Sequence, residues 1–528
     1  MRAASLNLLR SATRCTRPQV ARPRPVRCAV RWSSSDSEER QWSTPLAKTL
    51  AQAIETTGPV SVASYMRQCL TSDQGGYYTR QTPGHDQFGA KGDFITSPEI
   101  SQVFGELVGI WLYTEWMAQG RKERVQIIEV GPGRGTLMDD VLRTISSFKP
   151  FAQSVEAIYM IEASDDLRKQ QAQRLSGTGA PDEFELGWRA PCKYIPNCTV
   201  NWCEDIRFVP KEETSTPFIL AHEFFDALPI HVFQNVANST LPAASKTITP
   251  DGPLSPKTGP QAPKNQWHEL VVSPIHESQM SQNQTSEDGS PPPEFHLTLS
   301  KTPTPYSLYL PQTSDRYKAL QNTTDAIVEI SPESLSYMAD FAVRIGGANP
   351  PRSTQNKNEL KTQTSTATST SPISQPLPEP LQKPNPSGAA LILDYGPQST
   401  IPANTLRGIR SHRAVSPFVS AGLVDISADV DFVGLAEAAL DASSGVEVHG
   451  PVEQAYFLSS LGIMERTERL LKAAGDEEVR TRLEGAVKRL VDRGPTGMGR
   501  IYKAMAVVPF VEGARVRRPV GFGGGVFQ

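Results

Sequence analysis

The residues best suited to chemistry are an acid and three glycines between positions 129 and 135. Glu129 ends a run of β-branched residues, and Gly131, Gly133 and Gly135 follow at every second position. Glycine lets a ligand lie directly against the backbone, and the free N–H groups of a following helix favour polar or anionic groups. The pattern therefore predicts a nucleotide-type site at a turn from a strand to a helix that begins near Thr136.

The glycine spacing indicates which nucleotide would bind. A dinucleotide site needs G-x-G-x-x-G, and the third glycine of that pattern would fall at position 136, which is threonine, so the NAD interpretation weakens. A P-loop needs a lysine after its last glycine, and no lysine occurs between Arg124 and Arg143, which excludes ATP by that route. Acid-x-Gly-x-Gly-x-Gly is instead typical of S-adenosylmethionine-dependent methyltransferases, whose cofactor has a cationic amino-acid part that an acid suits.

Two further acids follow predicted strands. Glu162 comes directly after the apolar run 157–161, where it could accept both hydroxyls of a ribose. Asp205 follows a short strand at 199–203 and could contact the edge of an adenine. Each acid could also be an ordinary solvated residue at a strand end, but the glycine turn one βαβ unit upstream favours the ligand role for Glu162.

A third group of polar residues follows the predicted strand 217–221. His222, Glu223 and Asp226 lie here, in the sequence HEFFDALP. The carboxyl ends of parallel strands face the ligand crevice of an open sheet, so these side chains are candidates for catalysis. The alternative is that the two acids cap a turn while the neighbouring phenylalanines pack in the core.

Several predicted elements would position these residues. Ser97, Pro98 and Glu99 are typical of a helix start, with Ser97 as the cap, and the apolar residues up to Trp111 then fall on one helical face. Gly92 and Asp93 precede this helix and could form a lid over the ligand. The chain is therefore predicted to have an α/β fold, a Rossmann-like class I methyltransferase with a helical accessory region and low-complexity insertions.

Composition divides the chain of 528 residues into folded parts and insertions. Two tracts are rich in Ser, Thr, Pro and Gln and bury too little apolar surface to offset the cost of ordering the chain. The predicted boundaries are an N-terminal helical region at 44–120, the cofactor half of the core at 121–234, a mostly disordered insertion with a strand-like island at 235–293, a continuation of the core at 294–347, a disordered insertion at 348–388, a further continuation with accessory helices at 389–510, and a tail at 511–528. Within the tail, the glycine-rich part at 521–528 is predicted to be disordered.

The first 32 residues have the composition of a mitochondrial transit peptide. Eight arginines and no acid precede Asp36, and a cut near Arg31-Trp32-Ser33 would be natural. The alternative is a basic disordered tail. No apolar run is long enough for a membrane span or a secretory signal.

The net charge and the spacing of cysteines and histidines limit which ligands are expected. Removing the eight arginines changes the formal net charge from −3 to about −11, so we expect no binding to nucleic acid. The cysteines form no C-x-x-C pair and the eight histidines add no ligand spacing, so we expect no metal site.

Six blocks together resemble the MidA family of mitochondrial proteins. They are GDFITSPEISQVFGELVGIW (92–111), EVGPGRGTLMDD (129–140), HEFFDALPIHVF (222–233), VEISPES (328–334), ALILDYG (390–396) and the segment 406–439. The resemblance covers most of the chain from about residue 45 to 510, apart from the two insertions. It implies a mitochondrial matrix enzyme with S-adenosylmethionine as cofactor, which makes symmetric dimethylarginine on a core subunit in the peripheral arm of respiratory complex I and so helps to assemble it.

With that implied reaction, the candidate residues take roles. Glu223 would hold the acceptor guanidinium in a fork, with Asp226 as a second candidate and His222 as a proton acceptor. Glu129 and the three glycines would hold the methionine part of the cofactor. The chain has neither the double-Glu loop nor the Thr-His-Trp of the main class of arginine methyltransferases, so residue roles from that class do not transfer.

Two other interpretations stay open from the sequence. The first is an assembly chaperone that binds a complex I subunit and retains the cofactor fold without catalysis. The second is a methyltransferase for RNA or a small molecule, which is disfavoured by the acidic mature charge and by the lack of an Asn/Asp-Pro-Pro-Tyr/Phe motif after the fourth strand. Downstream, the basic segment 406–413 could dock an acidic partner, and Asp431 and Gln454 could face the substrate channel.

Overall fold

The computed structural model describes residues 40–80, 92–177, 181–237, 248–249, 252–253, 265–276, 291–350, 380–513 and 517–523. Trp42–Gln528 form one compact unit. The predicted transit peptide and most of the two insertions lie outside the described residues. Within the described ranges, no helix has the length and apolar character needed to cross a membrane.

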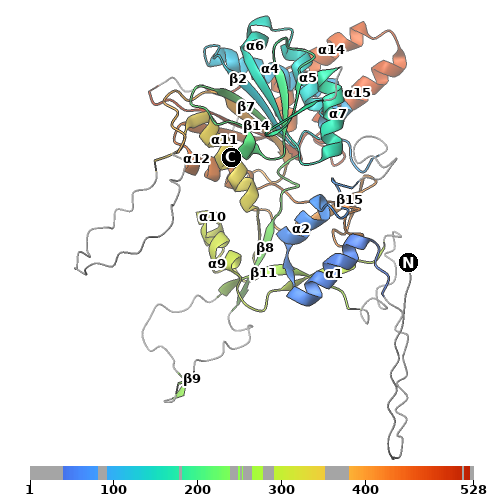
Figure 1. The fold of residues 1–528 in the computed structure, drawn as a ribbon, viewed down its shortest axis with the longest axis vertical. Helices are drawn as coiled ribbons and strands as arrows, with labels where there is room; N and C mark the ends of the chain where they lie inside the picture. The colour runs from blue at the N-terminus through green and yellow to red at the C-terminus, as the bar shows by residue number, and fades with distance from the viewer. Residues whose placement is uncertain are drawn as a thin grey trace, which may run out of the picture. The chain divides into compact units, whose positions relative to one another are not determined.

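The main sheet positions the site. Its nine described strands run in the order β18-β19-β14-β7-β2-β3-β6-β5-β4. Figure 1 labels β14, β7 and β2 near the centre of this sheet. The centre, from β14 through β7, β2 and β3 to β6, is parallel, which is the arrangement expected for a Rossmann-like core. The strands are β2 (Val125–Val130), β3 (Val155–Ile161), β4 (Asp182–Phe184), β5 (Gly187–Pro191), β6 (Thr199–Cys203), β7 (Thr216–His222), β14 (Ala389–Tyr395), β18 (Val446–Glu453) and β19 (Tyr502–Pro509).

Apolar residues on both faces of these strands explain the layered core. Ile127 of β2 packs with one helical layer and Ile128 with the other, and every residue of this strand is buried. Such continuous apolar runs are typical of parallel strands that are covered on both faces. One layer contains α4 (Gln102–Ala118), α5 (Thr136–Ile145), α6 (Lys149–Ser154), α7 (Asp165–Ser176), α13 (Gln454–Ser460), α14 (Ile463–Ala473) and α15 (Glu477–Val491); the other contains α11 (Pro332–Gly346) and α12 (Phe432–Ala442).

The predicted N-terminal helices form, with one correction. α1 (Pro45–Thr57) and α2 (Val62–Thr71) lie in the predicted helical region and are separated at Gly58. The predicted cap at Ser97 is wrong, because Thr96 caps α3 (Ser97–Ile100) in a capping box with Glu99. The helix then breaks at Ser101, whose hydroxyl caps α4 separately.

A second, antiparallel sheet lies beside α1 and α2 (Figure 1). Its order is β1-β11-β8-β13, with β12 also paired to β11. The segment 294–347, predicted as a continuation of the core, therefore contributes two strands to this sheet and only α11 to the main one. The elements are β1 (Val60–Ser61), β8 (His231–Ala237), β11 (Asn265–Pro274), β12 (Phe295–Leu299), β13 (Ile327–Ile330), α9 (Pro305–Tyr309), η2 (Leu310–Gln312) and α10 (Asp315–Lys318).

A small third sheet completes the walls of the site. It consists of β15 (Arg407–Arg410) between β16 (Arg413–Val415) and β17 (Asp425–Ser427). Ala421 and Ile426 of this region pack into the same core cluster as α1 and α2, which joins the third sheet to the second. The remaining described elements are η1 (Ile206–Phe208), β9 (Ile248–Thr249) and β10 (Gly252–Pro253).

The described part of the C-terminal tail packs on the main core, including Phe522 of the segment that the sequence predicts to be disordered. Nη1 of Arg517 lies 2.9 Å from Oε1 of Glu115, a fully buried carboxylate. The indole N–H of Trp111 donates to the carbonyl of Val520 at 3.1 Å, and Phe522 is buried. A buried charge needs a partner, so Arg517 fixes this segment against α4.

Candidate active site

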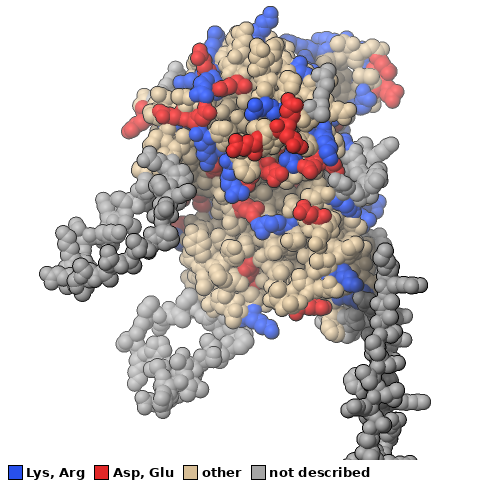
Figure 2. Space-filling view, in the orientation of Figure 1, with Lys and Arg blue, Asp and Glu red and all other residues tan. Residues whose placement is uncertain are grey.

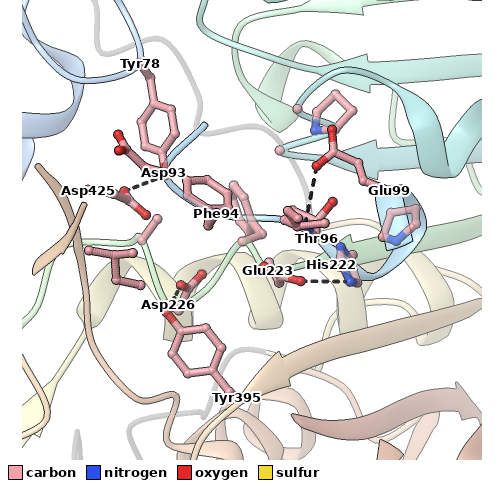
Figure 3. Close-up of a pocket in the computed structure, with 18 of the residues that line it drawn as sticks. Tyr78, Asp93, Phe94, Thr96, Glu99, His222, Glu223, Asp226, Tyr395 and Asp425 are labelled. Carbon is pink, nitrogen blue, oxygen red and sulfur yellow. Dashed lines mark hydrogen bonds and ion pairs between the residues drawn. The ribbon is translucent and has the colours of Figure 1, made fainter. Parts of the chain in front are cut away.

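A cavity of about 640 Å³ lies at the carboxyl ends of the central parallel strands. Residues of the main sheet, of the third sheet and of the segments around α2 and α3 line it. The predicted residues on its wall are Asp93, Glu129, Gly131, Gly133, Glu162, His222, Glu223 and Asp226. Gly92, Gly135 and Asp205 are not among the lining residues. Figure 3 shows the acidic part of this wall.

The glycine turn between β2 and α5 requires glycine for two reasons. Gly131, Gly133 and Gly135 have φ values of 63°, 52° and 74°, in the left-handed region that other residues rarely adopt. A Cβ on Gly131 would also lie only 2.7 Å from Cδ2 of Phe224. Gly135 caps α5 and faces Gln171, so its role is to position the helix rather than to line the cavity.

Two acids occupy the strand ends beside this turn. Glu129 is 2% exposed, and its Oε2 has no hydrogen-bond partner among the described residues. Burial, followed by the nearby Glu162, raises the pKa of Glu129 well above its usual value. Glu162 accepts from the backbone N–H of Ser164 at 2.8 Å, and burial raises its pKa to about 7.

Gln171 on α7 connects these two parts of the site. Its Nε2 donates to the carbonyl of Gly133 at 2.6 Å and lies 3.4 Å from Oε2 of Glu162. Its Oε1 accepts from the indole N–H of Trp202 at 3.0 Å, so the side chain is held in one orientation. Gln171 therefore fixes the turn relative to the acid at the end of β3. No local motif indicates this role, because the contacts cross between three elements.

The structure places Asp205, the predicted contact for an adenine edge, outside the cavity wall. Its carboxylate caps η1 and bonds to Arg207, with Oδ2 of Asp205 2.8 Å from Nη2 of Arg207. This bond to Arg207 is the main cause that lowers the pKa of Asp205. The preceding residue, Glu204, lines the cavity instead.

The segment after β7 is held in a strained conformation. Glu223 has φ of 48°, which is uncommon for a residue other than glycine and occurs often at functional sites. Its backbone N–H donates to the carbonyl of Leu393 at 2.9 Å. Oδ2 of Asp394 then accepts from the backbone N–H groups of Phe224 and Phe225, at 3.2 and 2.9 Å. The neighbouring strand β14 thus holds the turn that carries the candidate catalytic residues.

The three candidate catalytic side chains differ in their pKa shifts and in their hydrogen bonds. Nε2 of His222 lies 3.3 Å from Oε1 of Glu223 without hydrogen-bond geometry (Figure 3). Burial lowers the pKa of His222 to about 3, so this imidazole is neutral. Burial and then the charge of Asp226 raise the pKa of Glu223 well above its usual value. Asp226, also buried, accepts a hydrogen bond from the hydroxyl of Tyr395.

The turn after β7 also contains buried carboxylate oxygens that lack a hydrogen-bond donor. Oε1 of Glu223 and Oδ1 of Asp226 have no hydrogen-bond partner among the described residues. A buried acceptor without a donor costs about 1–3 kcal/mol, and more when it is charged. Two such oxygens on one turn beside a cavity fit a ligand that carries several N–H donors.

Asp93 lies on the wall but is fixed in place. The hydroxyl of Tyr77 donates to its Oδ2 at 2.9 Å, and the backbone N–H of Ser411 donates to its Oδ1 at 2.8 Å. Asp93 therefore holds the turn between β15 and β16 against the segment before α3. Residues 81–91, directly before the predicted lid, lie outside the described residues.

Four residues that stand out on the wall, beside the candidate acids, were not predicted from the sequence. They are Tyr78, Phe94, Tyr395 and Asp425. The hydroxyl of Tyr78 donates to Oδ1 of Asp425 at 2.9 Å, although the two residues are 347 positions apart. Only Tyr395, which follows Asp394 at a strand end, lies where a sequence pattern could have indicated it.

Among the C-terminal residues predicted to contact a partner or the substrate, Arg407 lines the cavity, whereas Asp431 and Gln454 do not. Nη1 of Arg407, in the basic segment, lies 2.8 Å from Oδ1 of Asp429. Cζ of Arg407 lies 4.6 Å from the ring centroid of Tyr395, and both residues line the cavity. Asp431 caps α12 and pairs with a side chain of α10, and Gln454 is buried and donates to a carbonyl of α15. Neither Asp431 nor Gln454 lines the cavity.

The wall fits the cofactor that the sequence predicts. Glu129 offers an unpartnered carboxylate to a cationic amino group, and Glu162 offers acceptors to ribose hydroxyls. The turn at Gly131 leaves no room for a side chain, so backbone lines this part of the cavity. In the part of the chain that the structure describes, no group of three His, Cys, Asp or Glu side chains could hold a metal ion.

Comparisons with known proteins agree with this fit. Residues 107–452 match the model of a family described as "Putative S-adenosyl-L-methionine-dependent methyltransferase". The mitochondrial protein arginine methyltransferase NDUFAF7 of Rattus norvegicus is 31% identical over 90% of this chain and 87% of its own length. The NDUFAF7 homolog of Drosophila melanogaster, also named mitochondrial, is 33% identical over 93% of this chain and 91% of its own.

A solved structure shares the fold. A superfamily member from Burkholderia thailandensis, bound to S-adenosyl-homocysteine, aligns over 92% of this chain and 94% of its own with a TM-score of 0.56 and 19% identity. The predicted fold class and cofactor are confirmed, and the names of the relatives support a mitochondrial location. The chain belongs to the MidA-like family of S-adenosyl-L-methionine-dependent methyltransferases.

Proposed function

We propose that this protein is a protein arginine N-methyltransferase of the mitochondrial matrix. Its product would be symmetric dimethylarginine on a core subunit in the peripheral arm of complex I, and the modification would support assembly of that complex. The names of the relatives support arginine as the acceptor. The observation that carries the proposal is the pair of buried, unpartnered carboxylate oxygens on Glu223 and Asp226 beside the glycine turn.

The chemistry of the guanidinium that accepts the methyl group explains why the site needs carboxylates. A free guanidinium stays protonated because its pKa exceeds about 12, and its lone pairs are delocalised. S-adenosylmethionine, which Glu129, the glycine turn and Glu162 would hold, would supply a methyl group that leaves the sulfonium sulfur for a nitrogen of the acceptor. Glu223 would hold two N–H groups in a fork, which orients the guanidinium plane and leaves a third nitrogen free to attack.

Methyl transfer to a guanidinium also requires that the group lose one proton, which can leave from a nitrogen that the carboxylate holds, and the pKa shifts favour Glu223 over His222 as the acceptor. Burial lowers the pKa of His222 to about 3, which makes it a poor base. Burial and Asp226 raise the pKa of Glu223, which makes its carboxylate a better one. In this proposal Glu223 both orients the guanidinium and takes the proton, while Asp226 stabilises the remaining positive charge.

The first test is the substitution Glu223→Gln. We expect the affinity for S-adenosylhomocysteine to stay within about twofold, because Glu129 and Glu162 are untouched, and turnover to fall by about 10²- to 10³-fold. Calorimetry and a methyl-transfer assay with complex I core subunits measure the two quantities. Glu213→Gln, on an exposed side chain, is the matched control. Unchanged turnover would remove Glu223 from the mechanism.

An experiment in cells distinguishes a catalytic role from a scaffold role. In cells that lack the protein, mass spectrometry of complex I core subunits should show the loss of a symmetric dimethylarginine, and the Glu223→Gln protein should fail to restore it. If that variant restored complex I assembly without the modification, the chaperone alternative would hold.

A further inference from the structure

Resting on the proposed arginine methylation, we infer that Asp425 and Tyr78 complete the acceptor pocket opposite Glu223. Together with Asp226 and Tyr395 they form two carboxylate–tyrosine pairs, and this double pair selects a guanidinium over a neutral or ammonium side chain.

Asp425 is placed for this role by two elements. It begins β17, is 5% exposed and lines the cavity. Its Oδ1 accepts from the hydroxyl of Tyr78, and no Lys, Arg or His of the described ranges forms an ion pair with it. The backbone N–H of Ala428, just after β17, donates to the carbonyl of Asp226 at 3.0 Å, which ties this strand to the turn after β7.

Asp226 repeats the same arrangement from the main sheet. One of its oxygens accepts from the hydroxyl of Tyr395, and the other is buried without a partner. Asp226 is 7% exposed and lines the same cavity. Figure 3 shows the two acids around Phe94, with Tyr78 on one side and Tyr395 on the other.

The two carboxylates repel one another. Burial and then Asp226 raise the pKa of Asp425 to about 7. Arg407 lowers the pKa values of both acids, but it is already paired with Asp429. A cation that enters the cavity would relieve this repulsion and supply donors to the free oxygens.

The shape of the donor set points to a guanidinium. Arginine presents five N–H donors in a plane and stacks on aromatic rings, whereas a lysine ammonium is a compact point charge with three donors. The wall offers acceptors on Glu223, Asp226 and Asp425, with the aromatic ring of Phe94 on the same wall. Citrulline has nearly the same shape without the charge, so it tests the electrostatic part of the selection.

The substitution Asp425→Asn removes the charge and keeps the shape. An asparagine oxygen can still accept from Tyr78, so a purely structural role for Asp425 would survive the change. Asp431→Asn is the matched control, because Asp431 lies in the same segment and outside the cavity, and asparagine also caps helices well.

The experiment measures binding rather than turnover. N-acetyl-L-arginine methylamide and its citrulline and lysine analogues are titrated into protein saturated with S-adenosylhomocysteine, and binding is followed by ligand-observed NMR. We expect the arginine compound to bind wild type at least tenfold more tightly than either analogue. Asp425→Asn should lose at least tenfold in arginine affinity and most of this discrimination, while its affinity for S-adenosylhomocysteine stays within twofold. Asp431→Asn should match wild type.

The result would overturn the inference if Asp425→Asn bound the arginine compound as wild type does, or if wild type failed to prefer it. Tyr78→Phe provides a second variant, with a smaller loss expected because the carboxylate remains. The outcome is separate from the proposed function. Selective arginine binding without methyl transfer would contradict that function and leave this inference standing.

Discussion

At the scale of single residues, the cofactor wall combines acids whose environment opposes their charge. Burial is the largest cause of the raised pKa values of Glu129 and Glu162, and the charge of Glu162 raises the pKa of Glu129 further. Glu129 has an unpartnered oxygen, whereas Glu162 has donors from Ser164 and Gln171. The two acids are therefore suited to different parts of one ligand, a cation and a pair of hydroxyls.

Glu162 should make cofactor binding depend on pH. Its pKa in the folded protein is about 7, above its usual value, so the carboxylate is protonated below pH 7 and ionised above it. Because the ionised form is the stronger acceptor for hydroxyl groups, the affinity for S-adenosylhomocysteine should rise between pH 6 and 8. Calorimetry across this range measures the change.

The control is Glu162→Gln, which cannot ionise. Its affinity should be lower by about tenfold or more at pH 8, since hydrogen bonds to charged groups contribute about 1.5–3 kcal/mol. The pH dependence between 6 and 8 should largely disappear. An equal pH dependence in the variant would assign the effect to another group.

At the scale of elements, the catalytic turn depends on its neighbour strand. The segment after β7 has a strained residue at Glu223, and Asp394 at the end of β14 binds two of the following backbone N–H groups. Strain of this kind persists only where surrounding contacts fix it. Asp394 is therefore a positioning residue for Glu223 and Asp226, although it is absent from the cavity wall.

The substitution Asp394→Ala tests this positioning role. It leaves two backbone N–H groups without their acceptor, so the turn should relax and kcat should fall by about tenfold or more. The affinity for S-adenosylhomocysteine should change by less than about threefold. Asp394→Asn retains an acceptor oxygen and should recover part of kcat; a loss of cofactor affinity equal to the loss of kcat would indicate general unfolding instead.

Local patterns explain how much of the fold was predictable. The strands at β2, β3, β6, β7 and β14 are short apolar runs whose burial on both faces leaves a clear mark in the sequence. The sequence did not indicate that Asp205 lies off the cavity wall, where its carboxylate pairs with Arg207, or that Thr96 and not Ser97 forms the capping box with Glu99. Both features depend on contacts two or three residues away.

The acceptor side of the cavity was less predictable for a different reason. Tyr78 and Asp425 meet only because the second and third sheets form around α1 and α2 and then face the main sheet. Neither residue lies in a pattern that indicates chemistry. Long-range contacts of this kind leave no periodic trace in one sequence, whereas the glycine turn does.

At the scale of the whole molecule, the cavity joins structures that fold from distant parts of the chain. Its cofactor wall comes from the main sheet, and its acceptor wall also needs the segments around Tyr78 and Asp425. In the space-filling view of one face of the molecule, acidic and basic side chains are interspersed (Figure 2). Because the two walls come from different segments of the chain, we expect S-adenosylhomocysteine to stabilise the cofactor wall more than the acceptor wall.

Hydrogen exchange with and without S-adenosylhomocysteine tests that division. At a concentration 100 times its Kd, the ligand should stabilise the folded state by about 2.7 kcal/mol and raise the unfolding temperature. Backbone protection should increase in 129–136 and 162–171, and much less in 407–427. Equal protection of both walls would show that cofactor binding also orders the acceptor side.

The place of β19 in the main sheet has a consequence for synthesis. This strand, at residues 502–509, lies between β18 and β14, so both neighbours have open edges until it pairs with them. Open edges of this kind invite pairing with other chains. The ribosome must therefore release almost the entire polypeptide before the sheet is complete. A premature stop codon just upstream of residue 502 would inactivate and aggregate the product, although Glu129, the glycine turn and Glu162 had already been translated.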